Sequence, residues 1–416
     1  MAAPRRGRYD GTGSRRRGAA LLAGGVPPLE LTIAPERHGG LSGLILCPAC
    51  GCACDDLAVA TLATACPRGA AWFAQWPDDP DVALLAGKPA TTAAALAAAA
   101  RLLSAARAPA VVGGAGLALD AQRAAVALAE RVRGLVVPLL GPWAAVRRAM
   151  QDVGLVTATL GEIRHRAELV VFWDCQPAAT HPRWLERFVP ATGALLERPR
   201  ELVFVGAATP WSPEVGHVSL PSGGTIEALV ELRRAAKSAM VAEPWQTLAA
   251  RLTSARCSAI VFGETLAVGG RWACRALFEL TRDLNNGAGR CVAVPLGPGN
   301  NAGGMESVLA WQTGWATAVD FGGDGPRPAW PPFAADVLVM AGDAPAPAGF
   351  DGVPCIRIGP RLDSAAAVSL RTRVPGVTGG GVWFRDDDVP LPLRPFRHDR
   401  APEAAALFEA LAAELP

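Results

Sequence analysis

The chain has 416 residues, half of which are apolar, and a formal net charge of +2 at neutral pH. This length is sufficient for two or three domains with cores of their own. The near-neutral charge argues against a dedicated nucleic-acid surface, which needs clustered positive charge. No apolar run reaches the roughly 18 residues that a membrane span requires.

Residues 1–40 differ in composition from the rest of the chain. Arginines recur here among glycine and serine, and a short apolar patch follows at 19–26. A twin-arginine export signal has the same order of features, but this apolar patch is short and no A-x-A-like cleavage site follows it. We therefore expect a disordered basic leader.

The ten cysteines bear on the cellular compartment. Five of them lie within residues 47–66, and the others are scattered singly through apolar segments. Secreted proteins pair their cysteines more evenly, whereas this distribution is typical of a cytoplasmic protein with one metal site and several buried thiols.

The N-terminal cysteines form the most specific motif of the chain. Cys47, Cys50 and Cys54 give the spacing C-x2-C-x3-C, and Cys66 follows in a separate turn. Four thiolates from different directions can bind a four-iron cluster, and a four-thiolate zinc site is the competing interpretation. Cys52 is an extra thiol within the motif, and a loop of thiols without metal is the third alternative. We expect residues 41–88 to form this Cys-rich module.

An internal duplication follows the Cys-rich module. Residues 109–142 read as strand, glycine-rich turn, amphipathic helix, strand and Gly-Pro, and residues 258–298 repeat that order. Two further apolar strands come after each copy, the first pair at 167–173 and 201–210. The second pair lies within residues 335–363.

This pattern predicts an α/β protein with two duplicated, doubly wound Rossmann-like domains. We place the first domain at 89–240 and the second at 241–376, followed by a C-terminal segment, 377–416, that ends in a helix. The glycine turns at 113–116 and 263–270 follow strands, but neither completes G-x-G-x-x-G. Ordinary helix–strand packing is therefore favoured over nucleotide binding at these turns.

Three motifs resemble one known family. They lie at 47–56, 151–184 and 297–321, and close counterparts occur in the same order in the B subunit of formylmethanofuran dehydrogenase. The resemblance spans about residues 44–400 and implies the fold of the molybdopterin oxidoreductase superfamily.

Active members of this family hold a bis-molybdopterin guanine dinucleotide whose tungsten or molybdenum is bound by a cysteine or selenocysteine in a Cys-His-Gly-Pro stretch. The corresponding stretch here is Leu139-Leu140-Gly141-Pro142. A hydrocarbon side chain has no lone pair for a metal, so we expect this cofactor to be absent. The segments at 206–213 and 377–394 also depart from the family's pterin-binding pattern.

The resemblance also points to a vestigial pterin cleft. Cys175 matches a position in the pterin-binding strand turn and not the metal ligand. His181 and Arg183 suit an anion such as a phosphate, with structural capping of their loop as the alternative. Asn300 and Asn301 read either as ligand contacts or as a turn.

Several other polar and aromatic residues have structural interpretations. We expect Asp55 and Asp56 to make backbone hydrogen bonds, because carboxylates do not stabilise an anionic cluster. His165 lies in a charged stretch and is expected on a solvated face. Trp311 and Trp315 are interpreted as core or interface anchors.

With these departures from the dehydrogenase pattern, the sequence resembles the B subunit of the formyltransferase/hydrolase complex of methylotrophs and related bacteria. That complex moves formyl groups from a tetrahydromethanopterin carrier to a furan carrier and hydrolyses them to formate, and other subunits carry the reaction. The resemblance implies a non-redox scaffold without catalytic residues of its own, docked to A, C and D homologues and chiefly to C. The alternative is an active tungsten or molybdenum dehydrogenase subunit with an unusual ligand set.

Overall fold

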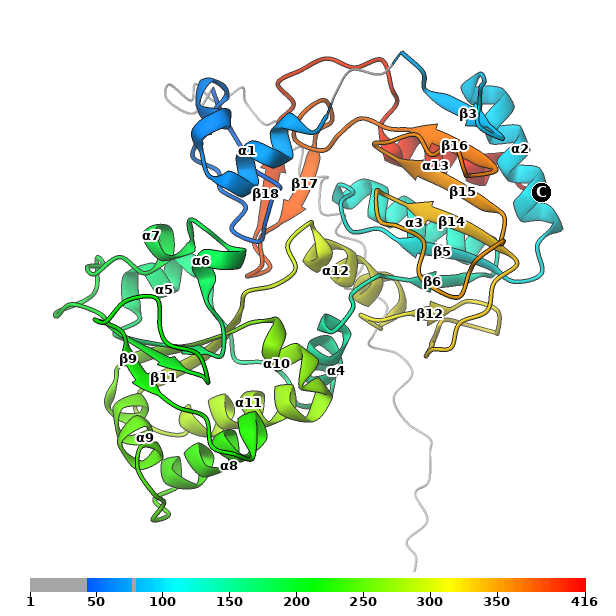
Figure 1. Cartoon of the computed structure of the whole chain (residues 1–416). Helices are drawn as coiled ribbons and strands as arrows, with labels where there is room; N and C mark the ends of the chain where they lie inside the picture. Colours follow the sequence, from blue (N-terminus) through cyan, green and yellow to red (C-terminus); the bar gives the residue numbers. More distant parts are fainter. Residues whose placement is uncertain (1–42, 77–79) are drawn as a thin grey trace, which may run out of the picture. The chain divides into compact units, whose positions relative to one another are not determined.

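Two β-sheets organise residues 43–76 and 80–416, the part of the chain that this computed structural model describes (Figure 1). The leader predicted for residues 1–40 lies outside the described residues. Gly43–Pro416 form one compact unit. The fold class is α/β, as predicted.

The larger sheet has nine strands, and helices α2, α3, α12 and α13 pack on one of its faces. These helices span Thr92–Ala105, Leu119–Arg131, Ala302–Thr313 and Ala404–Ala413. The strands, in sheet order, are β13 (Arg327–Pro328), β12 (Val319–Asp320), β6 (Leu135–Val137), β5 (Pro109–Gly113), β14 (Val337–Ala341), β15 (Cys355–Gly359), β16 (Val368–Arg371), β3 (Ala83–Leu85) and β4 (Lys88–Pro89).

The smaller sheet has five strands, and all neighbouring strands in it run parallel. In sheet order they are β11 (Arg290–Pro295), β10 (Cys257–Phe262), β7 (Leu169–Trp173), β8 (Glu201–Val205) and β9 (Gly216–Val218). One face is covered by α4 (Trp143–Val153), α8 (Gly224–Ala236), α9 (Trp245–Ser254), α10 (Glu264–Val268) and α11 (Gly270–Leu284). The other face packs against α5 (Leu160–Arg166), α7 (Trp184–Phe188) and the Cys-rich module, with α6 (Pro177–Thr180) beside α7.

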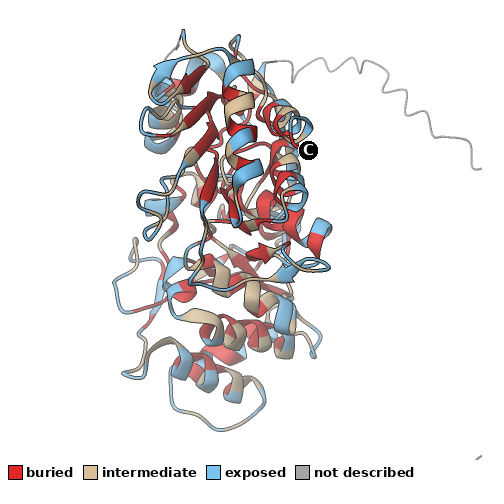
Figure 2. Cartoon of the chain, turned by 90° about the vertical axis from the view of Figure 1, so that its right-hand side faces the viewer, coloured by how far each residue is buried: buried red, intermediate tan, exposed pale blue. Residues whose placement is uncertain are grey.

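The strands are apolar on both faces because both faces are covered. In β7, Val171 and Trp173 point to the helical layer, while Val170 and Phe172 point to the face that carries the cysteines. Such runs without polar alternation are typical of buried parallel strands. Figure 2 shows the resulting contrast between buried strands and the exposed outer sides of the covering helices.

The two sequence repeats do not correspond to the two sheets. Each predicted strand forms, but β5 pairs with β14, and β10 pairs with β7. Each sheet therefore combines the first strand pair of one repeat with the second strand pair of the other, and the strands do not follow the predicted tandem domains 89–240 and 241–376. The physical reason is that apolar periodicity specifies a buried strand but not its neighbour.

The chain crosses between the sheets at equivalent points of the two repeats. It leaves the larger sheet after β6, through the Leu-Gly-Pro of residues 140–142, and enters α4. It returns after β11, through the Leu-Gly-Pro of residues 296–298, and enters α12. The segment that forms the five-stranded sheet is thus inserted, in the sequence, between the two segments that form the nine-stranded sheet.

The Cys-rich module and a hairpin complete the described unit. The module contains β1 (Leu44–Ile45), β2 (Leu57–Ala58), the 3-10 helix Val59–Thr64 and α1 (Pro67–Ala74). The hairpin joins β17 (Gly381–Phe384) to β18 (Pro390–Leu393). No helix within the described residues is long and apolar enough to cross a membrane.

Arg200, directly before β8, is a buried anchor of the smaller sheet. Its guanidinium donates hydrogen bonds of 2.7 to 3.3 Å to five backbone carbonyls, and burial lowers its pKa to about 10. The acceptors are the carbonyls of Ile163, Arg164, Ala167, Phe188 and Pro190.

Replacing Arg200 with lysine is expected to lower the free energy of unfolding by about 2–4 kcal/mol, because an ammonium cannot satisfy five carbonyls at once. Urea denaturation measures this loss. Exposed Arg198→Lys is the matched control and should change the free energy by less than about 0.5 kcal/mol. Equal effects of the two substitutions would contradict the anchoring role.

Candidate functional site

The cysteine motif lies on a tight loop between β1 and β2. The Cys47 amide donates to the Cys54 carbonyl at 2.8 Å, and the Ala53 amide donates to the Cys50 carbonyl at 3.1 Å. These bonds curl the loop so that its thiols face inward, and Cys47, Cys50 and Cys54 are all buried.

The fourth predicted cysteine joins them from α1. The Cys66 sulfur caps this helix by accepting the Gly69 amide at 3.3 Å. A Cβ atom at Gly69 would lie 3.4 Å from the Cys47 sulfur and 3.5 Å from the Cys66 sulfur, so both sulfurs flank this glycine. Burial, together with the nearby Cys50, Cys54 and Cys66 thiols, raises the pKa of Cys47 to about 12. The structure thus brings the four predicted cysteines together.

Cys52 is fully buried between two of the predicted ligands. Its thiol is hydrogen-bonded to the sulfurs of Cys50 and Cys54, which raises its own pKa. The same contact, assisted by the charge of His181, lowers the pKa of Cys50 to about 6. A lowered pKa favours the ligand form of a cysteine, which is the thiolate.

The two aspartates after the motif pair with arginines, which the sequence did not predict, and Asp56 also accepts a bond from its own backbone amide. The Arg183 guanidinium makes a bidentate pair with Asp56, with both distances 2.8 Å. Arg187 donates to Asp55 at 2.6 Å. These arginines also lower the pKa of Cys54, after the larger effect of its hydrogen bond with Cys52. Asp55 and Asp56 therefore hold the guanidinium groups of Arg187 and Arg183 near the Cys54 thiol.

The thiol arrangement bears on the metal alternatives. Across residues 43–76 and 80–416, no three His, Cys, Asp or Glu side chains are grouped so that they could hold one metal ion. Zinc would require four sulfurs about 2.3 Å from a single centre. A four-iron cluster instead gives each cysteine an iron of its own and needs more widely spaced sulfurs. The residues that would hold it are Cys47, Cys50, Cys54 and Cys66.

The tip of the β17–β18 hairpin lies against the cysteine loop. The Asp386 carboxylate is 2.9 Å from His181 Nε2, and its amide donates to the Gly51 carbonyl at 3.2 Å. A Cβ atom at Gly51 would lie 1.6 Å from an Asp386 oxygen, and one at Gly297 would lie 2.9 Å from its Cγ. Only residues without a side chain leave room for this carboxylate.

The next tip residue fixes α5. Asp387 Oδ2 accepts the Leu160 amide at 2.6 Å, and Asp387 also makes a bidentate pair with Arg385 at 2.7 Å. The Asp387 side chain is fully buried. The hairpin tip is therefore bonded to the smaller sheet through both His181 and α5.

A buried ion pair joins the two sheets beside the hairpin. Arg147 of α4 contacts Glu306 of α12 and lies 3.8 Å from Asp388 at the hairpin tip. Burial raises the pKa of Glu306 to about 7, against the opposing effect of Arg147. This pair links a helix that packs on the smaller sheet to one that packs on the larger sheet.

Asn300 and Asn301 form the turn before α12 and engage the rest of the chain. Both have positive φ, and the Asn300 carbonyl accepts the Gly116 amide at 2.6 Å. Buried Asn301 donates to the Leu117 carbonyl and accepts the Phe384 amide, each at 2.7 Å. The prediction of a turn is confirmed, and these contacts tie the turn to the hairpin.

The other predicted cleft residues also have partners within the chain. His181 shares its second ring nitrogen with the Thr180 hydroxyl at 2.8 Å. Arg183 adds a 2.6 Å bond to Glu186. The Cys175 thiol donates to the Val261 carbonyl, and burial raises its pKa.

The Leu139-Leu140 stretch lies between the two cores. Leu140 is buried with Trp143 and Val146 in the helical layer of the smaller sheet, and Leu139 packs with Val112 against the larger sheet. Leu140 is thus a core residue and Leu139 is partly buried, and both lie at the first crossing between the sheets.

Comparison with known proteins identifies the relationship. No family model matches the chain. It is 30% identical over 325 residues to the B subunit of the formyltransferase/hydrolase complex Fhc of Methylorubrum extorquens, covering 72% of this chain and 87% of that protein. It is 26% identical to the B subunits of tungsten-containing formylmethanofuran dehydrogenase 2 from Methanococcus maripaludis and Methanocaldococcus jannaschii, covering 84% of this chain and 92% of each relative.

The chain belongs to the family of formylmethanofuran dehydrogenase B subunits. The crystal structure of the formyltransferase/hydrolase complex FhcABCD from Methylorubrum extorquens with methylofuran contains a chain that matches it with a TM-score of 0.70 and 26% identity. The match covers 80% of this chain and 98% of that one.

One pocket lies where this α/β fold would be expected to bind a ligand, at the carboxyl ends of β5, β14 and β15. Its volume is about 340 Å³, and its lining includes Gly116, Asn300 and Asp343 together with three tryptophans. Pockets for single drug-sized molecules span about 300–1,000 Å³.

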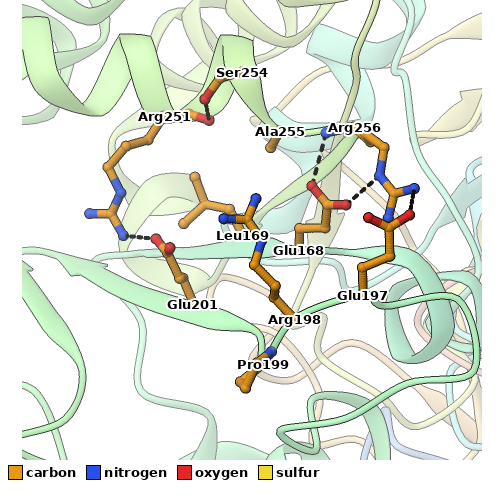
Figure 3. Close-up of a pocket in the computed structure, with 10 residues that line it drawn as sticks. All are labelled: Glu168, Leu169, Glu197, Arg198, Pro199, Glu201, Arg251, Ser254, Ala255 and Arg256. Carbon is orange, nitrogen blue, oxygen red and sulfur yellow. Dashed lines mark hydrogen bonds and ion pairs between the residues drawn. The ribbon is translucent and has the colours of Figure 1, made fainter.

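A second pocket opens at the opposite, amino-terminal edge of the smaller sheet (Figure 3). Its volume is about 570 Å³, and none of the predicted site residues lines it. Arg256 pairs with Glu168 and Glu197, and Arg251 pairs with Glu201. These charges neutralise one another across the pocket.

The residues at the hairpin tip and the Arg147–Glu306 pair were not predicted from the sequence. Three consecutive aspartates within the apolar 377–394 segment were the available signal for the hairpin tip. Glu306 is a single acid in an apolar helix, which indicates a buried partner such as Arg147. His165 is exposed, as expected. Trp311 and Trp315 are 61% and 37% exposed, which excludes the core interpretation for Trp311.

Gly51→Ala is expected to lower the free energy of unfolding by about 1–3 kcal/mol, because the new methyl group overlaps the Asp386 carboxylate. In an Asp386→Ala background the same substitution should cost much less, because the overlapping atoms are gone. A double-mutant cycle in urea measures the coupling. Additive effects would show that Asp386 does not occupy this position.

Glu306 is expected to make stability depend on pH. Its carboxyl pKa is higher in the folded chain than in the unfolded one, so the folded chain binds the proton more tightly. The protonated carboxyl therefore stabilises the folded chain fully below about pH 4.5, and this stabilisation is lost as pH rises through about 7. The free energy of unfolding should fall by up to about 3 kcal/mol over this range. Urea titrations from pH 4.5 to 8 should show this loss, and Glu306→Gln should remove it. The exposed Glu409→Gln control should retain the loss, and an unchanged profile in Glu306→Gln would refute the assignment.

Proposed function

We propose that this chain is the non-redox B subunit of a formyltransferase/hydrolase complex in tetrahydromethanopterin-linked one-carbon metabolism, which takes formaldehyde to formate. The observation that carries the proposal is the Leu139-Leu140 stretch. These residues correspond to the family's metal-ligand stretch, and their hydrocarbon side chains are packed in the two cores. Such side chains cannot bind tungsten or molybdenum.

The cleft supports the same proposal. Each of the predicted cleft residues is bonded within the chain. We infer that the polar groups of the ancestral cofactor site now stabilise the fold.

In this proposal the chain acts as a scaffold and has no catalytic residues. Its partners are the A, C and D subunits of the complex, chiefly C, and the formyl transfer and hydrolysis take place on other subunits. The relatives named as B subunits of multi-subunit enzymes support this role.

We also propose that Cys47, Cys50, Cys54 and Cys66 hold a four-iron cluster. The supporting observations are that the Cys50, Cys54 and Cys66 thiols lie near Cys47 and that the pKa values of Cys50 and Cys54 are lowered. When bound, such a cluster supplies one-electron transfer. Without a tungsten or molybdenum centre beside it, we assign it the role of bracing the Cys-rich module.

An active tungsten or molybdenum formylmethanofuran dehydrogenase subunit is the second candidate. The observation in its favour is the complete cysteine motif, since an electron-transfer cluster is most useful beside a redox centre. The two methanogen relatives are named as tungsten-containing enzymes.

Metal analysis of the purified native complex separates these functions. We expect tungsten and molybdenum below one-tenth of an atom per copy of this chain, about four iron atoms with acid-labile sulfide, and loss of that iron in Cys47→Ser. Half-buried Cys355→Ser, outside the motif, is the matched control and should retain the iron. Stoichiometric tungsten or molybdenum with extractable pterin would refute the non-redox proposal. An intact complex without iron would refute only the cluster.

A further inference from the structure

Helix α4 presents a charged face on the side away from the core. Trp143, Val146 and Ala149 are buried against the smaller sheet. Arg148 and Asp152 are one helical turn apart, so they project from the same face of the helix. α10 and α11 pack beside α4, as Figure 1 shows.

Arg148 contacts an exposed tryptophan directly, and Asp152 is connected to another one through Arg271. The Arg148 guanidinium lies 3.8 Å from the ring centroid of Trp330. Asp152 accepts a 2.6 Å bond from Arg271, whose guanidinium lies 5.1 Å from the ring centroid of Trp272. The two ends of this helix face therefore each carry an arginine stacked on an indole.

These indoles are open to solvent. Trp272 is 62% exposed and Trp330 is 48% exposed, and Val268 of the neighbouring α10 is 68% exposed. We define the α4 face as Arg148, Asp152, Val268, Trp272 and Trp330. Scattered exposed apolar residues are common on proteins, but several large ones around one helix mark an interaction surface.

The chemistry of the α4 face matches that of binding hot spots. Tryptophan and arginine are the residues that most often dominate interface energies. Stacking already orders the long side chains of Arg148 and Arg271, so binding loses less side-chain entropy. The α4 face is therefore preorganised for a partner.

The α4 face also spans both sheets. Trp330 lies two residues after β13 of the larger sheet, and Trp272 belongs to α11, which packs on the smaller sheet. Arg148 has no carboxylate partner within residues 43–76 and 80–416, so the face offers an unneutralised positive charge next to apolar rings. A fitting partner presents aliphatic side chains together with a carboxylate.

We propose that the α4 face docks another subunit of the formyltransferase/hydrolase complex through an apolar, acidic surface of that subunit. This inference rests on the proposed function, because membership of the complex supplies the occupant. One partner bound here contacts both sheets at once and so uses the chain as a scaffold.

The test co-expresses the full chain with the other subunits of its complex and measures co-purification through a tag on this chain. Trp272→Ala/Trp330→Ala and, separately, Arg148→Glu are each expected to reduce the recovery of at least one partner subunit tenfold or more. The Leu195→Ala/Met240→Ala control removes two other exposed apolar side chains and should retain full recovery. Circular dichroism and thermal unfolding of the isolated full chain should be unchanged in all variants.

The outcomes separate the two levels of the proposal. Full recovery of every partner with the α4-face variants would overturn this docking site while leaving the proposed function intact. Failure of the unsubstituted chain to recover any partner would instead contradict the proposed function. Loss of a homodimer in the variants, with the other subunits still bound, would assign the face to a second copy and also overturn the inference.

Discussion

The contact between the Asp386 carboxylate and His181 holds together segments that are far apart in the sequence. Asp386 lies at the tip of the β17–β18 hairpin, and the same carboxylate fills the space that Gly51 and Gly297 leave without side chains. It thereby joins the cysteine loop, the turn after α6 and the second crossing between the sheets. A buried carboxylate is costly unless it is bonded, so the position of each of these segments depends on the others.

In the proposed function the fold persists without the family's cofactor, and this constraint is the means that we propose for it. In an active subunit, a ligand at the cleft would satisfy polar groups from both sheets. Here Asp386, Asp387 and Asp388 supply internal partners, while Leu139 and Leu140 extend the apolar cores through the first crossing. The scaffold proposal follows from this replacement, since a subunit whose cleft is satisfied from within retains a fixed surface for its neighbours.

The sequence predicted the elements of the fold better than their arrangement. The buried strands at 169–173 and 337–341 were identifiable from their apolar runs, yet their exchange between the two repeats was not, because periodicity does not specify partners. Similarly, the C-x2-C-x3-C spacing predicted that Cys47 and its companions converge. The Asp386 contact and the Arg147–Glu306 pair were not predictable, because each joins residues more than 150 positions apart without a shared motif.

The central claim is that the complex containing this chain does not oxidise the formyl group. Hydrolysis consumes water and releases formate with no electrons, whereas oxidation to carbon dioxide consumes water and also releases two electrons and two protons. The most direct measurement supplies the purified complex with a formylated furan carrier and an electron-accepting dye, and follows formate and dye reduction together. The account predicts stoichiometric formate with no reduced dye. Reduction of the dye in step with formyl consumption, with carbon dioxide as the product, would contradict it.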